Sequence, residues 1–519
     1  MMSRLEAPEK YRRDVNVWID EAIWGHRFYN EQTPWLVFLE FLTIFRDRNS
    51  KGCALNEPRS RNSHEDFDYS IPRLVPLRQL VFNNPHVYPI EQSRYSEVEK
   101  WNSWMERSEF TDGWGQEYLR KRFSSFSHFA RLVGFFQTTA VEPHRQRRWS
   151  SKFLFPYSKN CLYADLPGDV VNGSADRRFF ARSGELLYLM LNRSGSGPEI
   201  AKKISESILC EEGKWDHVIK ALSPKDHDLE KRFVNSSIGY LPYGERPEYS
   251  ALAETWLNLL SLELPGESLL DPLMRLSCLH MLLYMLRRSN EEINDSTEME
   301  PRIVLEIASP SKTTLFELSR DIFGANRTLS MRAVRAHVQA AKKDAAWRKA
   351  CEAPFPAKAA CDFLKERFSW RTDDVPSSGD PDTVFDSLIS SSEKRHQQHL
   401  AKVHSEWGRQ VGLVAARRGI GTWYSPDDSL LKALVMCTVE RREEYNRFLA
   451  DIYERFRLVI GVAEAERAFG HLPTDQNVFI QNTQRLERRL RTLGLLHRLS
   501  DDCAYVENPF RRKLSDEKK

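Results

Sequence analysis

Apolar residues near the C-terminus recur at alternating spacings of four and three, which is the pattern of a single buried stripe on an α-helix. The stripe follows Pro473, and Gly494 comes directly after its last member, so we expect the helix to end there. Two short apolar runs flank Ser500-Asp501-Asp502 and predict a β-hairpin. Helix, glycine, strand, turn and strand is the order of a winged-helix module. The stripe consists of Phe479, Thr483, Leu486, Leu490 and Leu493.

The same helix carries a polar flank opposite its apolar stripe. At about 100° per residue, Gln481, Arg485, Arg488, Arg489 and Thr492 fall together on this flank. In a DNA-binding interpretation the arginines contact phosphates or guanine edges, and Gln481 and Asn482 read bases. Arg498 flanks the predicted wing.

A second interpretation of this module is protein docking, with arginines that are simply solvated. The turn at Asp501-Asp502 is acidic and lies where a wing would approach phosphates, which weighs against DNA contact. Both interpretations stay open at the level of sequence.

The rest of the chain shows mostly helical periodicity, and we expect a mainly α, multi-domain protein with a C-terminal winged-helix-like module. Residues 49–72 are polar and predict a surface loop, and Glu440–Val459 predicts one strong helix. The segment around Val375–Pro381 supports no regular element and predicts a linker. The expected organisation is a helical N-terminal domain (1–150), a helical middle region with a few short strands (151–372), a linker (373–386) and a C-terminal region (387–519).

Basic and aromatic residues alternate in a second cluster, His144–Trp149. Arg145, Arg147 and Arg148 could contact a nucleic-acid backbone there. The alternative is a solvated loop between helices, because charge runs usually lie on the surface.

Composition adds few constraints. Apolar residues make up 41% of the chain, which is enough for a sizeable core. The 76 Lys and Arg nearly balance the 73 Asp and Glu, so any basic site must be local. The 8 Cys are scattered without a CxxC pair, and the charged N-terminus lacks an apolar core; both predict a cytoplasmic protein. The longest apolar stretch, Trp35–Phe45, is about half the length of a membrane span.

Catalytic motifs are absent from the sequence. It contains no P-loop, no G-x-G-x-x-G after a strand and no G-x-S-x-G elbow. His396 and His399 would share a helix face and could hold a metal, but a solvated helix is the simpler interpretation. Asp176 with Glu212-Gly213-Lys214 fits a short nuclease pattern that recurs by chance. We therefore predict no catalytic residue, no metal and no cofactor.

Four segments carry a resemblance. Asp20–Arg27 with Glu31–Trp35, together with Asp176–Glu185 and Phe448–Phe510, resemble proteins encoded in bacterial anti-phage defence islands. The nearest description is a non-helicase accessory subunit of a multigene system such as Druantia. The resemblance implies a cytoplasmic bacterial protein that acts in a complex, with a partner supplying ATP hydrolysis or nuclease activity.

The leading functional expectation is thus a non-catalytic subunit of an antiviral defence complex that binds double-stranded DNA, partner proteins or both. The alternatives are a divergent metal-dependent nuclease and a pure scaffold without DNA contact.

Overall fold

The computed structural model is mainly helical, with 64% of the residues in helices and 8% in strands. This confirms the predicted fold class at the level of secondary structure. The structure describes residues 4–58, 64–72, 77–108, 115–138, 159–162, 182–210, 214–223, 233–294, 300–307, 313–372, 380–500 and 503–511, except for single positions at 27, 31, 78, 79, 82 and 83.

One large hydrophobic core organises most of the described chain, which we call the body. Helix α13 (Gly266–Asn294) runs through its middle and packs against α3 (Pro34–Ser50), α12 (Pro247–Leu260) and α14 (Thr314–Gln339). This core is a single cluster whose members range in sequence from Val17 to Val506. The predicted N-terminal, middle and C-terminal regions therefore all contribute side chains to it. Among the described helices, α13 alone is long and apolar enough to cross a membrane, and 89% of its most apolar window is buried inside the protein.

The N-terminal part of the body contains a strand pair that the sequence did not indicate. β1 (Asp68–Pro72) lies in the segment predicted to be a loop, and it pairs antiparallel with β2 (Phe233–Ser237). Its partner is more than 150 residues away, so no local hairpin signal announces it. The helices around this pair are α1 (Glu9–Arg13), α2 (Asp20–Trp24), α9 (Ser183–Asn192) and α10 (Gly197–Ser207).

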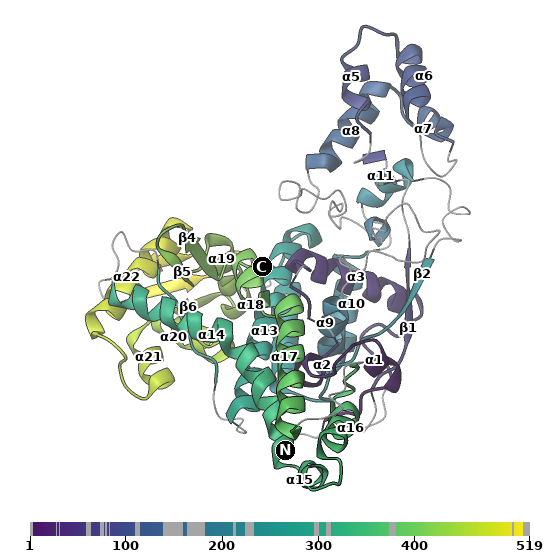
Figure 1. Ribbon diagram of the computed structural model, residues 1–519. Coiled ribbons are helices and arrows are strands. Elements are labelled where there is room, and N and C mark those ends of the chain that lie inside the picture. Colours follow the sequence, from purple (N-terminus) through teal and green to yellow (C-terminus); the bar gives the residue numbers. More distant parts are fainter. Residues whose placement is uncertain are drawn as a thin grey trace.

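A smaller unit, the projecting lobe, extends away from the body at the top of Figure 1. Its own core is aromatic, with Trp101, Trp104, Phe126 and Phe129 in mutual contact. The Arg122 guanidinium donates to the carbonyls of Lys220 (2.8 Å) and Ser223 (2.6 Å), which closes the C-terminal end of its last helix. The lobe consists of α5 (Val87–Glu91), α6 (Glu97–Arg107), α7 (Glu117–Arg122), α8 (Phe126–Thr138) and α11 (Lys214–Leu222).

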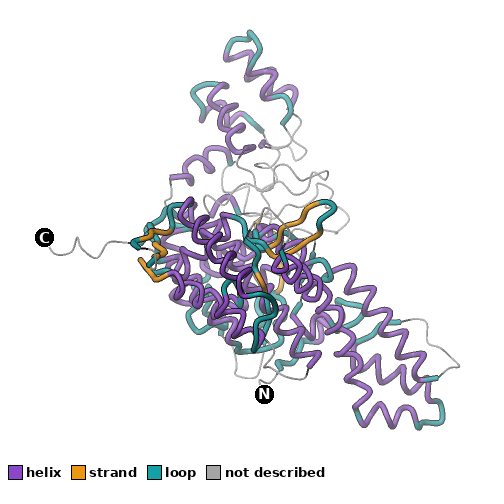
Figure 2. The backbone as a smooth tube through the Cα atoms, turned by 90° about the vertical axis from the view of Figure 1, so that its left-hand side faces the viewer, coloured by secondary structure: helices purple, strands orange, loops and turns teal. Residues whose placement is uncertain are grey.

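A second helical projection lies at the lower right of Figure 2. Helix α17 begins at Pro381, inside the range expected as a linker, and it packs against α14 and α16. Asp380 and Pro381 form a favourable helix start, which explains why a helix begins before residue 386, the predicted end of the linker. The elements here are η5 (Ala340–Lys343), α15 (Ala345–Cys351), α16 (Pro356–Phe368), α17 (Pro381–His399) and α18 (Val403–Gln410).

The C-terminal region adds short strands to the helices on the left of Figure 1. The predicted helix Glu440–Val459 is shorter than expected, because residues 442–444 form a strand that pairs with the end of the chain. The elements are β3 (Ile303–Val304), β4 (Val414–Arg417), β5 (Gly421–Tyr424), α19 (Asp428–Thr438), β6 (Arg442–Glu444), α20 (Tyr445–Phe456), β7 (Leu458–Val459), α21 (Val462–Phe469), α22 (Gln476–Thr492), β8 (Leu496–Arg498) and β9 (Ala504–Glu507).

Candidate nucleic-acid interface

Helix α22 has the amphipathic character that its sequence predicts. Phe479, Leu486 and Leu490 are fully buried on one side. The Asp475 carboxylate accepts a hydrogen bond from the Asn477 N–H at the first turn, and Gly494 adopts a left-handed conformation (φ +73°) directly after the helix. The helix is therefore fixed at both ends and along its buried side.

The chain after α22 forms the predicted hairpin. β8 and β9 pair antiparallel, and β6 adds a third strand on the other side of β9. The guanidinium of Arg442 lies 4.1 Å from the ring centre of Tyr505, across the β6–β9 pair. The hairpin thus belongs to a small sheet and is not an isolated extension.

The exposed flank of α22 carries positive charge without a compensating acid. Gln481 and Arg488 are exposed and Arg485 is half-buried, and Arg485 donates to Gln481 Oε1 at 3.3 Å. Arg491, which we did not predict as a site residue, is also exposed. Among the described residues, no Asp or Glu pairs with Arg485, Arg488 or Arg491. By contrast, the nearby Arg489 and Arg498 each form an ion pair.

Two predicted DNA-contacting arginines are instead engaged within the protein. Arg489 donates to Asp428 Oδ1 at 2.7 Å and to the Pro426 carbonyl at 2.9 Å. Arg498 lies 3.3 Å from Glu487 Oε1. Their charges are largely offset by these carboxylates, so they are weaker candidates for phosphate contact than the sequence indicated.

Asn482 requires a correction, because its side chain is fully buried. Its amide donates to the Leu305 and Ile460 carbonyls (2.9 and 3.0 Å) and accepts from the Ile307 N–H (2.8 Å). It joins α22 to the segments next to β3 and β7 and cannot read bases. Its spacing from Phe479 and Leu486 placed it in the apolar stripe, and this signal was available in the sequence.

Several other sequence-based candidates fall on residues that the structure does not describe. Arg145, Arg147 and Arg148 lie outside the described ranges, as do Asp176, Glu212 and the acidic turn Asp501-Asp502. In the part of the chain that is described, no group of three or more His, Cys, Asp or Glu residues could hold a metal ion.

His396 is buried, contrary to the solvated helix that we expected. Its Nδ1 lies 3.0 Å from Asp20 Oδ1, and its Nε2 lies 2.9 Å from Ser330 Oγ. The order Ser, His, Asp is that of a hydrolase triad, but the imidazole is 0% exposed. Ser330 also lies inside α14, where the backbone N–H groups bond within the helix and cannot form an oxyanion hole. The arrangement therefore connects α2, α14 and α17 as a structural contact.

The ion pair between Arg395 and Glu21, next to His396, is also a contact between helices. Arg395 on α17 donates to Glu21 Oε2 on α2 at 3.0 Å, next to a small open cavity that Asp14 and His399 also line. Because Glu21 already binds the guanidinium, this cavity offers no free cationic group to a ligand.

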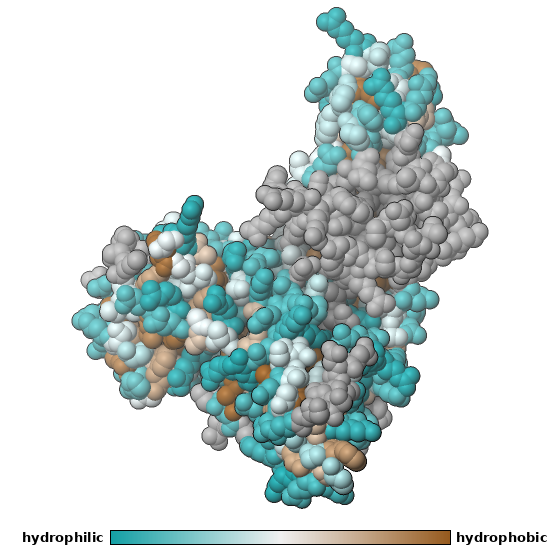
Figure 3. Space-filling model, viewed as in Figure 1, coloured by the Kyte–Doolittle hydropathy of each residue, from teal (hydrophilic) through white to brown (hydrophobic). Residues whose placement is uncertain are grey.

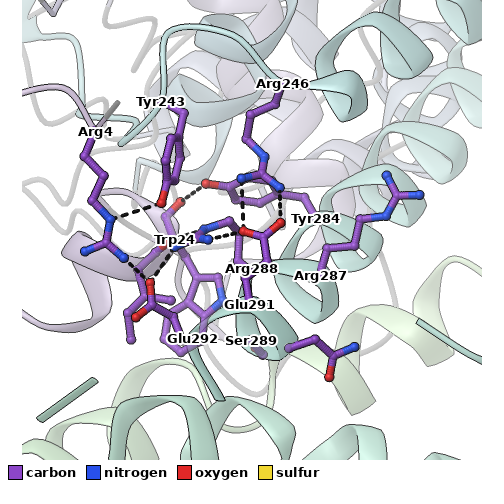
Figure 4. Close-up of polar contacts among 12 residues, drawn as sticks. Arg4, Trp24, Tyr243, Arg246, Tyr284, Arg287, Arg288, Ser289, Glu291 and Glu292 are labelled. Carbon is purple, nitrogen blue, oxygen red and sulfur yellow. Dashed lines mark hydrogen bonds and ion pairs between the residues drawn. The ribbon is translucent and has the colours of Figure 1, made fainter. Parts of the chain in front are cut away.

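A larger ion network closes the C-terminal end of α13 (Figure 4). Arg288 donates to Glu292 Oε1 at 2.6 Å, and Arg4 and Glu291 join the same cluster. Arg246 contributes bonds to Glu291 Oε1 (2.7 Å) and to Glu248 Oε1 (2.8 Å). Arginines and glutamates alternate and satisfy one another, so the network fixes the N-terminal segment onto α13 and leaves no unmatched charge for a ligand.

A buried carboxyl group on α3, that of Glu40, lies against the start of α9. Glu40 Oε2 accepts hydrogen bonds from Gln32 Nε2 and the Gly184 N–H, both at 2.7 Å. Burial and the nearby charge of Glu185 raise the pKa of Glu40 to about 8. Glu185 in turn accepts from the Tyr69 hydroxyl at 2.7 Å. Gln32 and Gly184, which both bond Glu40, belong to two of the segments that carry the defence-island resemblance, and all three residues are enclosed by the core.

No protein-family model matches the chain, and no curated protein matches it. Of the polar features described above, the unpaired arginines on α22 are the one that faces solvent and could contact a charged partner.

Proposed function

We propose that this protein is a non-catalytic DNA-binding subunit of a cytoplasmic, multiprotein antiviral complex, and that α22 is the recognition helix of a winged-helix-like module. The proposal depends on one observation: Arg485, Arg488 and Arg491 have no acidic partner among the described residues, on a helix whose opposite side is buried. The order of α22, β8 and β9, with β6 as a third strand, supports the winged-helix assignment. The defence setting comes only from the resemblance, which is carried by Asp20–Arg27, Glu31–Trp35, Asp176–Glu185 and Phe448–Phe510.

Electrostatics explains why a nearly neutral chain could bind DNA through this helix. Helix α22 has four arginines and one glutamate, and the glutamate already pairs with Arg498. Each arginine on a phosphate releases counterions, so the binding constant falls steeply with salt. We expect weak, salt-sensitive binding to duplex DNA, because the attraction comes only from the local charge of α22.

The test is a binding titration of the full chain with a labelled duplex of about 20 base pairs, a length of about two helical turns, at several salt concentrations. The variant Arg485→Ala/Arg488→Ala/Arg491→Ala should bind at least about tenfold more weakly at 0.1 M salt, with a salt slope reduced by about two to three. The matched control is Arg107→Ala/Arg131→Ala, which removes two exposed arginines from the projecting lobe and should change little. No binding by the wild-type protein at 0.05 M salt would refute the proposal.

Protein docking is the second candidate, because two large apolar side chains are exposed on this module. Ile480 on α22 is 40% exposed and Leu499 at the end of β8 is 65% exposed. A partner protein that covers them would gain apolar burial. Ile480→Ser/Leu499→Ser should then lower the recovery of neighbouring gene products in a pull-down and leave DNA binding unchanged.

A further inference from the structure

The β4–β5 hairpin presents two more arginines to solvent. Arg417 ends β4 and Arg418 begins the turn, and both are exposed. The turn is tight, because Gly419 (φ +78°) and Gly421 (φ +117°) adopt conformations that other residues rarely reach. Among the described residues, neither Arg417 nor Arg418 has an acidic partner within ion-pair distance.

The base of this hairpin is held firmly. The Tyr424 hydroxyl lies 2.7 Å from His404 Nε2 and accepts from Asn326 Nδ2 at 2.9 Å. Trp423 Nε1 donates to Glu306 Oε2 at 3.2 Å. With its base bonded to α14, α18 and the segment after β3, the hairpin is a stiff support for the arginines at its tip.

The hairpin base borders the exposed flank of α22. Arg489, at the edge of that flank, donates to Pro426 O in the loop after β5 and to Asp428 Oδ1 at the start of α19. Strands of four residues reach about 13 Å from base to tip. This reach is comparable to the width of about 12 Å of a DNA major groove, so a helix in the groove and a hairpin tip on the adjacent backbone are compatible in size.

The acids around the hairpin are already paired. Asp321 lies 3.3 Å from Arg320, Asp427 lies 3.2 Å from Arg275, and Asp428 pairs with Arg489. The charges of Arg417 and Arg418 are therefore not offset by these neighbours.

We propose that the β4–β5 hairpin is a second phosphate-binding element, and that Arg417 and Arg418 contact the backbone of the same duplex DNA that α22 engages. This inference rests on the proposed DNA-binding function and extends it to a separate element. Neither arginine reads bases in this arrangement, so the hairpin adds affinity that is independent of sequence.

The experiment compares the wild-type chain with Arg417→Ala/Arg418→Ala and with Arg417→Lys/Arg418→Lys in the duplex titration. The alanine variant should bind about tenfold more weakly at 0.1 M salt, and its salt slope should fall by about two. The lysine variant retains the charge and should stay close to the wild type. Thermal melting of both variants should match the wild type, because the side chains are exposed.

The possible results separate this inference from the proposed function. If the wild type binds and the alanine variant binds equally well with the same slope, the hairpin proposal is wrong and the α22 proposal stands. If the hairpin variant loses binding and the α22 variant does not, the hairpin stands and the α22 proposal is wrong. A wild type that binds no duplex overturns both proposals. If heparin displaces the labelled duplex as well as unlabelled duplex does, the protein does not recognise duplex DNA as such.

Discussion

Asn482 and Glu40 show how buried polar residues determine this fold at single positions. Asn482 connects three backbone groups from two segments, which follow β3 and β7. Glu40 on α3 accepts the N–H groups of Arg182 and Gly184 at the start of α9, at 3.2 and 2.7 Å. In each case one side chain satisfies donors or acceptors that would otherwise be buried without a partner.

Replacement of Asn482 by alanine should destabilise the protein by about 2–4 kcal/mol, because it leaves two carbonyls and one N–H without partners in the core. Urea denaturation measures the loss. Gln481→Ala is the matched control, since that neighbour is exposed, and it should change stability by less than about 0.5 kcal/mol. Equal stability of the two variants would show that water replaces the Asn482 bonds.

Glu40 should make the free energy of unfolding fall as pH rises through neutrality towards 8. Its folded pKa of about 8 exceeds the unfolded value of about 4.3, so the folded state binds more protons between these values. The stabilisation is complete below the unfolded pKa and is lost as pH rises through 8, at about 1.4 kcal/mol per pH unit at most.

The measurement is urea denaturation between pH 7 and 9, where His64, His280 and His404, whose pKa values are lowered by burial to about 4, 3 and 4, stay neutral. Glu40→Gln retains an acceptor and should flatten the curve relative to the wild type. Parallel curves for the two proteins would contradict this assignment.

At the level of elements, local patterns were predictive and long-range pairings were not. The stripe of α22, its glycine stop and the following hairpin are all encoded within a few residues of one another. β1 and β6 pair with distant segments, so the local sequence patterns predicted a loop for residues 49–72 and one helix for residues 440–459 instead. The unpaired state of Arg485 and the paired state of Arg489 depend on Asp428, which no helical pattern could place.

Arg122 provides an element-scale prediction, because it closes α11 from a different helix. Arg122→Ala removes the bonds to the carbonyls of Lys220, Ala221 and Ser223. Amide hydrogen exchange in 214–223 should become faster, by about a factor of ten for a loss of 1.4 kcal/mol. Lys121→Ala, at the exposed neighbouring position, should leave exchange unchanged, and identical behaviour of the two variants would refute the capping role.

At the level of the whole molecule, the N-terminal and C-terminal regions share one core. Trp407 Nε1 donates to the Gln32 carbonyl at 2.7 Å, and Asp20 and Glu21 bind His396 and Arg395. The linker-like composition at 373–379 therefore separates sequence segments whose side chains meet again in the same core.

Division of the chain between residues 372 and 380 should accordingly yield two fragments that do not fold alone. Each fragment would expose part of the continuous core, and co-expression should restore a complex of native size by gel filtration. Two fragments that are each monomeric, with cooperative thermal melting, would show instead that the halves are independent domains.

The projecting lobe has a mechanical consequence that follows from its connections. Its two pieces, 77–138 and 214–223, flank α9 and α10, which belong to the body, so a single backbone cut would not detach it. The lobe and the body are therefore joined by more than one crossing of the chain. Pro72 and Phe233 end β1 and β2 at the same edge, so a pull on the lobe would draw both strands in one direction. The load would pass into the body through α3 without shearing the β1–β2 ladder.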